Sequence, residues 1–290
     1  MQKYKVVILG SGIAGMTAAI YLKRGGISPL IIENNAPGGT LNLIPEVENY
    51  PGYDNIPGPD LAMNIYSQVT KLGIEYKFLN IKEIDLENKI INNEIEYDYL
   101  IIATGRKHRL LNLESEDKLL GRGISTCALC DGNFYKDKEV IVVGGASSAL
   151  AESLYLSSIC KKVTMIVRRD SFTGENYLIE KVLNTPNIKV IFNSIITSYN
   201  TKDDKLVSVT LDNKKKIKID GVFLAIGSTP NSELFDLEKE NGYIITNNNN
   251  ETSVKNVFAV GDVIKKDYYQ LINASSEGMI AASTIIEREK

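Results

Sequence analysis

Cys127 and Cys130, two cysteines separated by two residues, have the clearest potential for chemistry in this sequence, and the acidic Asp131 follows them directly. Cysteines at this spacing can close a small disulfide ring, and a helix N-terminus in the same segment favours the thiolate form of a cysteine. The motif is therefore consistent with a two-electron redox switch. Its alternatives are half of a zinc site or two ordinary buried thiols.

The rest of the sequence argues against the zinc alternative. A structural zinc site requires four Cys or His ligands, usually in paired spacings. Beyond the pair, the chain contains one other cysteine, Cys160, and a single histidine, His108. We therefore predict no metal site, and the choice between a redox pair and buried thiols depends on the motifs that flank the pair.

Length and composition are typical of a globular protein with two domains. The chain has 290 residues, of which 43% are hydrophobic and 24% are charged, and a chain of this length normally forms more than one core. The formal net charge of −3 provides no basic field for nucleic acid or an anionic membrane. We predict neither nucleic acid nor membrane as a partner.

The expected compartment is the cytoplasm. A strand is predicted at residues 5–9, which leaves no room for a signal peptide, and no apolar run reaches the length of a membrane-spanning helix. In a reducing compartment, a C-x-x-C motif is more often catalytic than a structural disulfide. This context favours the redox interpretation.

Residues 10–15 form a G-x-G-x-x-G turn between a predicted buried strand and a predicted helix. In such a turn Gly10 permits the tight bend, Gly12 lets a pyrophosphate approach the backbone, and Gly15 lets the helix pack closely on the strand. A second predicted strand ends in Glu33, at the spacing where an acidic residue binds a ribose hydroxyl. The segment predicts dinucleotide binding, and a tight turn without a ligand is the alternative.

Several loops and strand ends are candidates to complete this site. Loops at residues 37–40 and 49–52 are rich in residues that leave backbone groups accessible, and Asn49 adds a side-chain amide. A predicted strand stops at residues 103–105, where glycine allows a close approach, and another ends in Asp262. We interpret these segments as contacts for a bound flavin, with Asp262 accepting a hydrogen bond from a sugar-like hydroxyl. Without a ligand they would be ordinary loops and turn caps.

The middle of the chain predicts a second strand-turn-helix unit, with its turn at residues 144–149. This turn has Ala146 where the backbone should approach a pyrophosphate, and the methyl group obstructs a diphosphate. The next predicted strand ends in Arg168 and Arg169, which either bind a 2′-phosphate or are ordinary surface charges. We interpret the unit as a nucleotide-binding scaffold with a defective ligand site.

Six motifs occur together, at residues 10–15, 37–39, 48–52, 103–105, 127–132 and 257–262. Together they resemble the low-molecular-weight thioredoxin reductases, nearly from end to end. The resemblance implies an α/β fold with two Rossmann-like, three-layer domains. It also implies a discontinuous FAD-binding domain, residues 1–111 and 235–290, with an inserted second domain, residues 112–234, that carries the C-x-x-C motif.

The resemblance also assigns roles to the site residues. It implies that Cys130 is the cysteine next to the flavin ring, that Cys127 attacks the disulfide of thioredoxin, and that Asp131 donates and accepts the proton. FAD is the implied cofactor, thioredoxin the implied substrate and a homodimer the implied assembly. The positions that correspond to FAD contacts are Gly10, Gly12, Ile13, Ala14, Gly15, Glu33, Gly39, Thr40, Leu41, Asn49, Ala103, Thr104, Gly105, Gly261, Asp262, Tyr269 and Gln270.

Three departures from the family concentrate on its NADPH site. Ala146 stands where the family has a third glycine, and Glu152 is the one acid where the family has an acidic pair. The family's His-Arg-Arg…Arg phosphate clamp has lost its first and last members, which are Val167 and Thr173 here.

The flavin motifs depart from the family at two positions, with Thr40 in place of glutamine and Tyr269 in place of arginine. Because the losses fall mainly on the NADPH site, we predict that the chain does not take electrons from NADPH. It resembles the ferredoxin-dependent flavin thioredoxin reductases of clostridia, which implies reduced ferredoxin as the donor. The alternative is an ordinary NADPH-dependent thioredoxin reductase with a degenerate site.

Two remoter alternatives share the flavin motifs. A ferredoxin:NADP reductase of the same architecture has no need of the C-x-x-C motif, so Cys127 and Cys130 count against it. A non-enzymatic FAD redox sensor need not complete the motif with Asp131. Both alternatives predict a protein without thioredoxin reductase activity.

Overall fold

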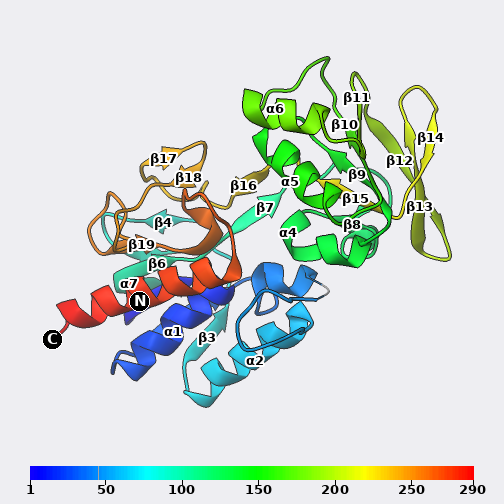
Figure 1. Ribbon diagram of the computed structural model, residues 1–290. Coiled ribbons are helices and arrows are strands. Elements are labelled where there is room, and N and C mark those ends of the chain that lie inside the picture. The colour runs from blue at the N-terminus through cyan, green and yellow to red at the C-terminus, as the bar shows by residue number, and fades with distance from the viewer. Residues whose placement is uncertain (45) are drawn as a thin grey trace. The chain divides into compact units, whose positions relative to one another are not determined.

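The chain divides into two compact units, which are described separately. The computed structural model describes residues 1–44 and 46–290 (Figure 1). The first unit combines Met1–Lys107 with Thr229–Lys290, and the second comprises His108–Ser228. The expected domain boundaries, after residues 111 and 234, lie a few residues further along the chain than this division. The first unit is built from two separate stretches of sequence.

One sheet forms the centre of the first unit. Its strands are β1 (Gln2–Leu9), β2 (Pro29–Glu33), β3 (Glu75–Phe78), β4 (Ile84–Asp85), β5 (Ile90–Ile91), β6 (Ile95–Ile102) and β19 (Val257–Ala259). They are arranged in the order β3-β2-β1-β6-β5-β4, and β19 also pairs with β6. Pairing is parallel among β3, β2, β1, β6 and β19, whereas β4 and β5 are antiparallel additions.

The pairing register aligns the carboxyl ends of the central strands. Leu9 pairs with Ile32 on one side and with Ile102 on the other, and Ile102 also pairs with Ala259. Parallel strands that end level with one another deliver the residues after them to one edge of the sheet. The G-x-G-x-x-G turn, the Ala-Thr-Gly segment and the Gly-Asp pair beyond β19 are therefore brought to the same edge.

Helices and short strands complete the first unit. Its helices are α1 (Ile13–Arg24), α2 (Gly58–Lys71), α7 (Leu271–Arg288) and the 3-10 helices η1 (Gly39–Leu43) and η3 (Gly261–Val263). A short pair of strands is β17 (Lys239–Glu240) with β18 (Tyr243–Ile244). Another pair, β7 (Arg106–His108) with β16 (Ser228–Pro230), includes the residues at which the division between the units falls.

Strand β1 separates two cores because its side chains alternate between the two faces of the sheet. Val6 and Ile8 are fully buried in a core that they share with α1 and α7. Val7 and Leu9 are fully buried in a second core on the other face, which includes residues of β18 and η3. The first unit is therefore a three-layer structure.

The second unit is built around a parallel sheet of its own. Its strands are β8 (Ile124–Ser125), β9 (Glu139–Val143), β10 (Lys162–Ile166), β11 (Ile188–Ile191) and β15 (Gly221–Leu224), in the order β11-β10-β9-β15-β8. A separate antiparallel sheet contains β12 (Ile196–Lys202), β13 (Lys205–Leu211) and β14 (Lys216–Lys218). The helices are α3 (Glu116–Leu119), α4 (Ala128–Asp131), η2 (Gly132–Tyr135), α5 (Ser147–Ser157) and α6 (Asn176–Leu183). The predicted α/β class with two Rossmann-like domains is confirmed.

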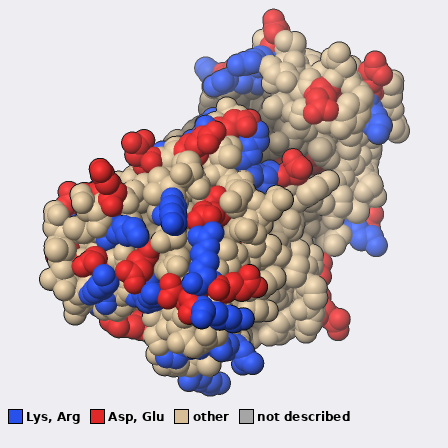
Figure 2. Space-filling model, turned by 90° about the vertical axis from the view of Figure 1, so that its left-hand side faces the viewer, with Lys and Arg blue, Asp and Glu red and all other residues tan. Residues whose placement is uncertain are grey.

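The charged surface is mixed in sign on the face shown in Figure 2, where Lys and Arg residues are interspersed with Asp and Glu. Ion pairs of the first unit include Lys3 with Glu96 at 2.8 Å and Arg288 with Glu251 at 2.7 Å. Exposed pairs of this kind add little to stability. Within the described residues, no helix is both long and apolar enough to cross a membrane.

Replacement of Gly278 tests the packing of α7 on α1. An added Cβ at Gly278 would lie 2.3 Å from the carbonyl oxygen of Ala14, so Gly278→Val forces the two helices apart. We expect the free energy of unfolding to fall by about 1–3 kcal/mol, measured by urea denaturation. Glu287→Ala, at an exposed position of the same helix, is the control, and an unchanged midpoint for Gly278→Val would contradict this packing.

Candidate active site

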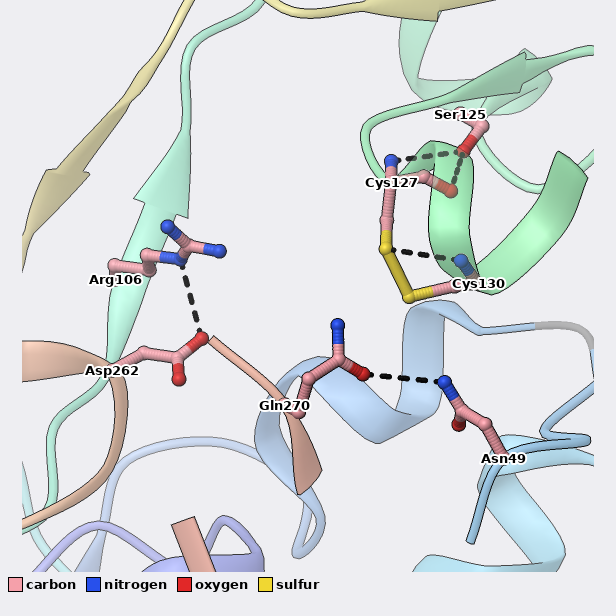
Figure 3. Close-up of a disulfide and its surroundings, with 7 residues drawn as sticks. All are labelled: Asn49, Arg106, Ser125, Cys127, Cys130, Asp262 and Gln270. Carbon is pink, nitrogen blue, oxygen red and sulfur yellow. Dashed lines mark hydrogen bonds and ion pairs between the residues drawn. A yellow bond between two sulfur atoms is a disulfide. The ribbon is translucent and has the colours of Figure 1, made fainter. Parts of the chain in front are cut away.

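The two cysteines of the C-x-x-C motif form a disulfide at the start of α4 (Figure 3). Their Cα atoms are 5.3 Å apart. Cys127 is the N-cap residue of α4, and its sulfur accepts a hydrogen bond from the N–H of Cys130 at 3.2 Å. The same N–H favours the thiolate of Cys127 when the disulfide is reduced. Within the described residues, no cluster of three or more His, Cys, Asp or Glu side chains is arranged to hold a metal ion.

The third cysteine, Cys160, differs from this pair. It is a buried free thiol in the second unit, and burial raises its pKa to about 11. A thiol with so high a pKa carries almost no thiolate near neutral pH, which makes it a poor nucleophile. Thiol chemistry in this chain is therefore concentrated at Cys127 and Cys130.

Asp131 ends α4 and is half-buried. In the part of the chain that the structure describes, its Oδ1 atom is buried and accepts no hydrogen bond. Burial raises the pKa of Asp131 above its ordinary value of 3.8, and a hydrogen bond from Ser125 lowers the pKa by less. The Ser125 hydroxyl also accepts a hydrogen bond from the N–H of Cys127 at 3.0 Å. One hydroxyl thus links the redox pair to the acid.

Tyr135 is a second residue near Asp131 that the sequence did not single out. Its ring packs edge-on against Phe223, with the ring centroids 5.2 Å apart. Gly221 leaves the space for this ring, because an added Cβ there would lie 2.2 Å from it. Burial, followed by the charge of Asp131, raises the pKa of Tyr135 to about 12. A neutral phenol therefore lies close to the acid.

The G-x-G-x-x-G turn joins β1 to α1, and its glycines occupy three different environments. Gly10 has a φ of +102°, and an added Cβ would lie 2.4 Å from the carbonyl oxygen of Ala103. At Gly15 an added Cβ would lie 2.1 Å from the carbonyl oxygen of Gly10. Gly12 caps α1 without a side-chain hydrogen bond, and an added Cβ would meet no described atom within 4 Å. The backbone at Gly12 is open to a ligand at the N-terminus of α1.

Glu33 lies beside this turn, as predicted, at the end of β2. Its Oε2 atom accepts hydrogen bonds from the N–H and the hydroxyl of Ser11, both at 2.9 Å. Its Oε1 atom accepts one from the N–H of Asn34 at 2.8 Å. These contacts hold the carboxylate next to the turn, where a ribose hydroxyl would approach.

The loop at residues 37–40 lies against the same turn. The N–H of Gly38 donates to the carbonyl of the turn at Ser11, at 2.9 Å. An added Cβ on Gly39 would lie 3.4 Å from the Cα of Gly12. Leu41 is buried within η1, which fixes the loop to the core, whereas the neighbouring Thr40 is exposed.

Asn49 and Gln270 come from distant parts of the chain and are joined by a hydrogen bond between their side chains (Figure 3). The Nδ2 atom of Asn49 donates to Oε1 of Gln270 at 3.2 Å. Gln270 precedes α7 as its N-cap residue. The structure therefore brings these two predicted flavin contacts together at the start of α7.

Predicted contact residues from three parts of the chain meet at the carboxyl edge of the first sheet. An added Cβ on Gly261 would lie 3.0 Å from the Cβ of Ala14, and Ile13 is buried beside it in α1. Thr104, between Ala103 and Gly105, donates from its hydroxyl to the carbonyl of Asn231 at 2.7 Å. The Ala-Thr-Gly segment is thereby fixed at this edge.

Asp262 and Tyr269 both contact Arg106, which the sequence did not single out. The Nε atom of Arg106 forms an ion pair with Oδ2 of Asp262 at 3.2 Å (Figure 3). The guanidinium carbon lies 3.9 Å from the centroid of the Tyr269 ring. The only sequence signal for Arg106 is its position directly after the Ala-Thr-Gly segment.

In the second unit, residues 173–175 lie against the turn that precedes α5. The N–H of Thr173 donates to the carbonyl of Gly145 at 2.8 Å, and the N–H of Glu175 donates to the hydroxyl of Ser147 at 3.1 Å. Between them, an added Cβ on Gly174 would lie 2.8 Å from the backbone nitrogen of Ser147. Residues 173–175 thus lie against the first amide of α5, whereas the equivalent position of α1 is open. The sequence predicted the Ala146 methyl group as an obstacle and did not predict this segment.

Comparison with known proteins identifies the family. Residues 4–278 match the pyridine nucleotide-disulphide oxidoreductases. The chain is 37% identical to the thioredoxin reductase of Bacillus subtilis, over 97% of this chain and 93% of that protein. It belongs to the thioredoxin reductase family.

Two solved structures show how this family resemblance extends to the fold. The thioredoxin reductase of Streptococcus pyogenes is 35% identical, with a TM-score of 0.93 over 99% of each chain. The ferredoxin-flavin thioredoxin reductase of Clostridium acetobutylicum is 28% identical, with a TM-score of 0.54 over 100% of this chain and 99% of that chain. The chain is therefore an oxidoreductase of this family.

The family implies FAD as the cofactor, and the first unit of this thioredoxin reductase relative fits it. A Cβ would fill the open backbone at Gly12, and among the described residues no side chain caps the start of α1 by a hydrogen bond. Glu33 provides carboxylate oxygens beside this turn, and Asp262 provides them at the end of the neighbouring β19 segment. The arrangement matches the needs of a dinucleotide, which are amide donors for phosphates and acceptors for hydroxyls.

Replacement of Asp131 tests its buried environment through pH. Because the pKa of Asp131 is raised on folding, the folded state holds its proton more tightly than the unfolded state, and stability falls as the pH rises through this range. We expect Asp131→Asn to gain stability relative to the oxidised wild type as the pH rises from about 4 to 8, measured by urea denaturation. Asp137→Asn, at an exposed acid, is the control, and a pH-independent difference for Asp131→Asn would refute the prediction.

Replacement of Gly12 tests whether the affinity for FAD can be lowered without a change in the stability of the fold. Because an added Cβ at Gly12 meets no described atom, Gly12→Ala should leave the thermal midpoint of the protein without FAD unchanged. The methyl group would occupy the approach of the pyrophosphate, so the affinity for FAD should fall by about tenfold or more. Quenching of FAD fluorescence measures the affinity, and Thr17→Ala in the same helix is the control. Unchanged FAD affinity would show that the phosphates lie elsewhere.

Proposed function

We propose that this chain is an FAD-dependent reductase of thioredoxin that draws its electrons from reduced ferredoxin. The observation that carries the reductase proposal is the Cys127–Cys130 disulfide, followed directly in sequence by the half-buried acid Asp131. Relatives named thioredoxin reductase, in Bacillus subtilis and Listeria monocytogenes, support thioredoxin as the acceptor. We further propose that the protein works in the cytoplasm as a homodimer.

The first half of the proposed cycle reduces the disulfide. Bound FAD supplies the two electrons, which it receives from the donor. In this proposal Cys130 faces the flavin and Cys127 faces the protein substrate. The two electrons break the S–S bond, and two protons, one of them passed through Asp131, convert the pair to a dithiol.

The second half passes the electrons to thioredoxin. Cys127 passes its proton to the Asp131 carboxylate, its thiolate attacks the thioredoxin disulfide and forms a mixed disulfide, and the released thioredoxin sulfur takes that proton from Asp131. Cys130 then loses its proton and attacks the sulfur of Cys127, which restores the disulfide, and the released second thioredoxin sulfur takes up the proton that Cys130 lost. Two electrons and two protons have moved to thioredoxin. Because burial raises the pKa of Asp131, its proton is available closer to neutral pH than that of an exposed aspartate.

The choice of ferredoxin as donor is supported by the start of α5. Ala146 places a methyl group where a glycine would leave the turn bare, and residues 173–175 lie against the first amide of the helix. The phosphate-clamp positions Val167 and Thr173 carry no charge, and Val167 is buried. The similarity to the ferredoxin-flavin thioredoxin reductase of Clostridium acetobutylicum also supports this donor.

An NADPH-dependent reductase with a degenerate site is the second candidate. It is favoured by the match to the pyridine nucleotide-disulphide oxidoreductases. It is also favoured by Arg168 and Arg169, which are exposed just beyond the end of β10 and have the charge to bind a 2′-phosphate.

The donor is tested by the flavin spectrum under argon. We expect reduced ferredoxin to bleach the flavin absorption within seconds, and NADPH or NADH at physiological concentration to leave it oxidised, because residues 173–175 cover the turn. Dithionite provides the fully reduced reference. Rapid bleaching by NADPH would overturn the ferredoxin proposal and establish the second candidate.

Two cysteine variants test the remainder of the proposal in the same assay. Cys130→Ser should keep donor-dependent flavin reduction and lose thioredoxin turnover. Cys160→Ser is the matched control, because this buried thiol has no part in the cycle, and it should keep turnover. A wild-type protein whose flavin is reduced but which never reduces thioredoxin would instead support a ferredoxin:NADP reductase or a redox sensor.

A further inference from the structure

Four charged side chains form a largely buried cluster around the turn that follows β19. We name it the Asp262 cluster, and its members are Arg106, Asp262, Lys266 and Glu277. The side chains of Arg106, Lys266 and Glu277 are 16%, 10% and 14% exposed, and that of Asp262 is 24% exposed. Burial of four charges is expensive in desolvation unless they are paired, and a hydrophobic core would be at least as stable. The cluster therefore points to a function beyond stability.

Arg106 is fixed from two directions within this cluster. Its Nε atom lies 3.2 Å from Oδ2 of Asp262, and its guanidinium carbon lies 3.9 Å from the centroid of the Tyr269 ring. The Tyr269 ring is supported in turn by Tyr243, with centroids 5.6 Å apart. A planar guanidinium can stack face-on on a ring while its edge pairs with a carboxylate, whereas an ammonium group acts as a point charge, and that of Lys266 lies further out, 5.5 Å from the centroid of the same ring. The Asp262 carboxylate is thereby held beside a cation whose own position is set by the Tyr269 ring.

Lys266 and Glu277, the other two members of the cluster, fix the backbone of the turn that follows β19. Lys266 pairs with Oε2 of Glu277 at 2.8 Å and with Oδ1 of Asp262 at 3.7 Å. Oε2 of Glu277 also accepts a hydrogen bond from the N–H of Gly261 at 2.7 Å. Both oxygens of Asp262 thus face a cation, and the residue before it is held by a third side chain. Asp262 nevertheless keeps more exposure than its partners, which makes it the member that a ligand can reach.

We propose that Arg106 is a positioning residue for FAD, which acts by holding the Asp262 carboxylate, through its stack on Tyr269, in the orientation that accepts a hydrogen bond from the sugar-like chain of the flavin. The inference rests on the proposed binding of FAD by the first unit. In this proposal the Arg106 guanidinium affects only the flavin half of FAD, with its sugar-like chain. The adenosine diphosphate half would be held by the turn beside Gly12, and Asp262 would hold the flavin half.

This division of the ligand gives a test that a merely structural role would not pass. Arg106→Ala should weaken FAD binding to the deflavinated protein by about tenfold, measured by quenching of flavin fluorescence. The affinity for ADP, which lacks the flavin and its sugar-like chain, should stay unchanged by calorimetry. Lys107→Ala, at the exposed neighbouring position, is the control and should change neither affinity.

Three conservative variants keep the inference testable if Arg106→Ala folds poorly. Arg106→Lys keeps the charge and Tyr269→Leu keeps the ion pair, yet both lose the stack, so each should weaken FAD binding by about threefold to tenfold without affecting ADP. Tyr269→Phe keeps the ring and should bind FAD within about twofold of the wild type.

The outcomes separate this inference from the proposed function. Unchanged FAD affinity in Arg106→Ala, or an equal loss of FAD and ADP affinity in all the variants, would overturn the positioning role of Arg106. A wild-type protein that binds no FAD would instead refute the proposed function itself.

Discussion

The level carboxyl ends of three parallel strands, β1, β6 and β19, are the constraint on which the cofactor site of this chain depends. Hydrogen bonding fixes Leu9, Ile102 and Ala259 in one row, so the three segments that follow them emerge side by side. The glycine turn then needs Gly10, because the carbonyl of Ala103 leaves no room for a side chain. A shift of β19 by one residue would turn its side chains to the opposite faces of the sheet and displace Asp262 from its partners.

The two strand-turn-helix units show how similar turns acquire different accessibility. In the first, the turn before α1 stays open at Gly12, where an added Cβ would meet no described atom within 4 Å. In the second, residues 173–175 donate two hydrogen bonds to the turn and lie against the start of α5. The scaffold is retained, while the space beside the helix amides is filled by the chain. The accessibility of such a turn thus depends on a neighbouring segment as well as on the turn itself.

The sequence was sufficient for features that depend on local spacing. The glycine turn, the acid at Glu33 and the Cys127–Cys130 pair are each set by residues within one strand-turn-helix segment, where type and distance define the chemistry. Arg106, Ser125 and Tyr135 could not be found in this way, since each owes its role to tertiary contacts. An arginine after a strand is usually a surface charge, and only the fold shows that Arg106 lies over Tyr269. The contact of Gly174 with the start of α5 likewise depends on the path that the chain takes after β10, which local spacing does not reveal.

The discontinuity of the first unit has a consequence for its assembly during synthesis. Residues 108–228 form the second unit in one uninterrupted stretch, so its strands can all pair once that stretch has left the ribosome. The first unit, although it begins at residue 1, still lacks β19 and α7 at that moment. Its β6 edge and the face of α1 are then uncovered, and such exposed edges and apolar faces invite association with other chains. The inserted unit is therefore complete before the one that surrounds it in sequence.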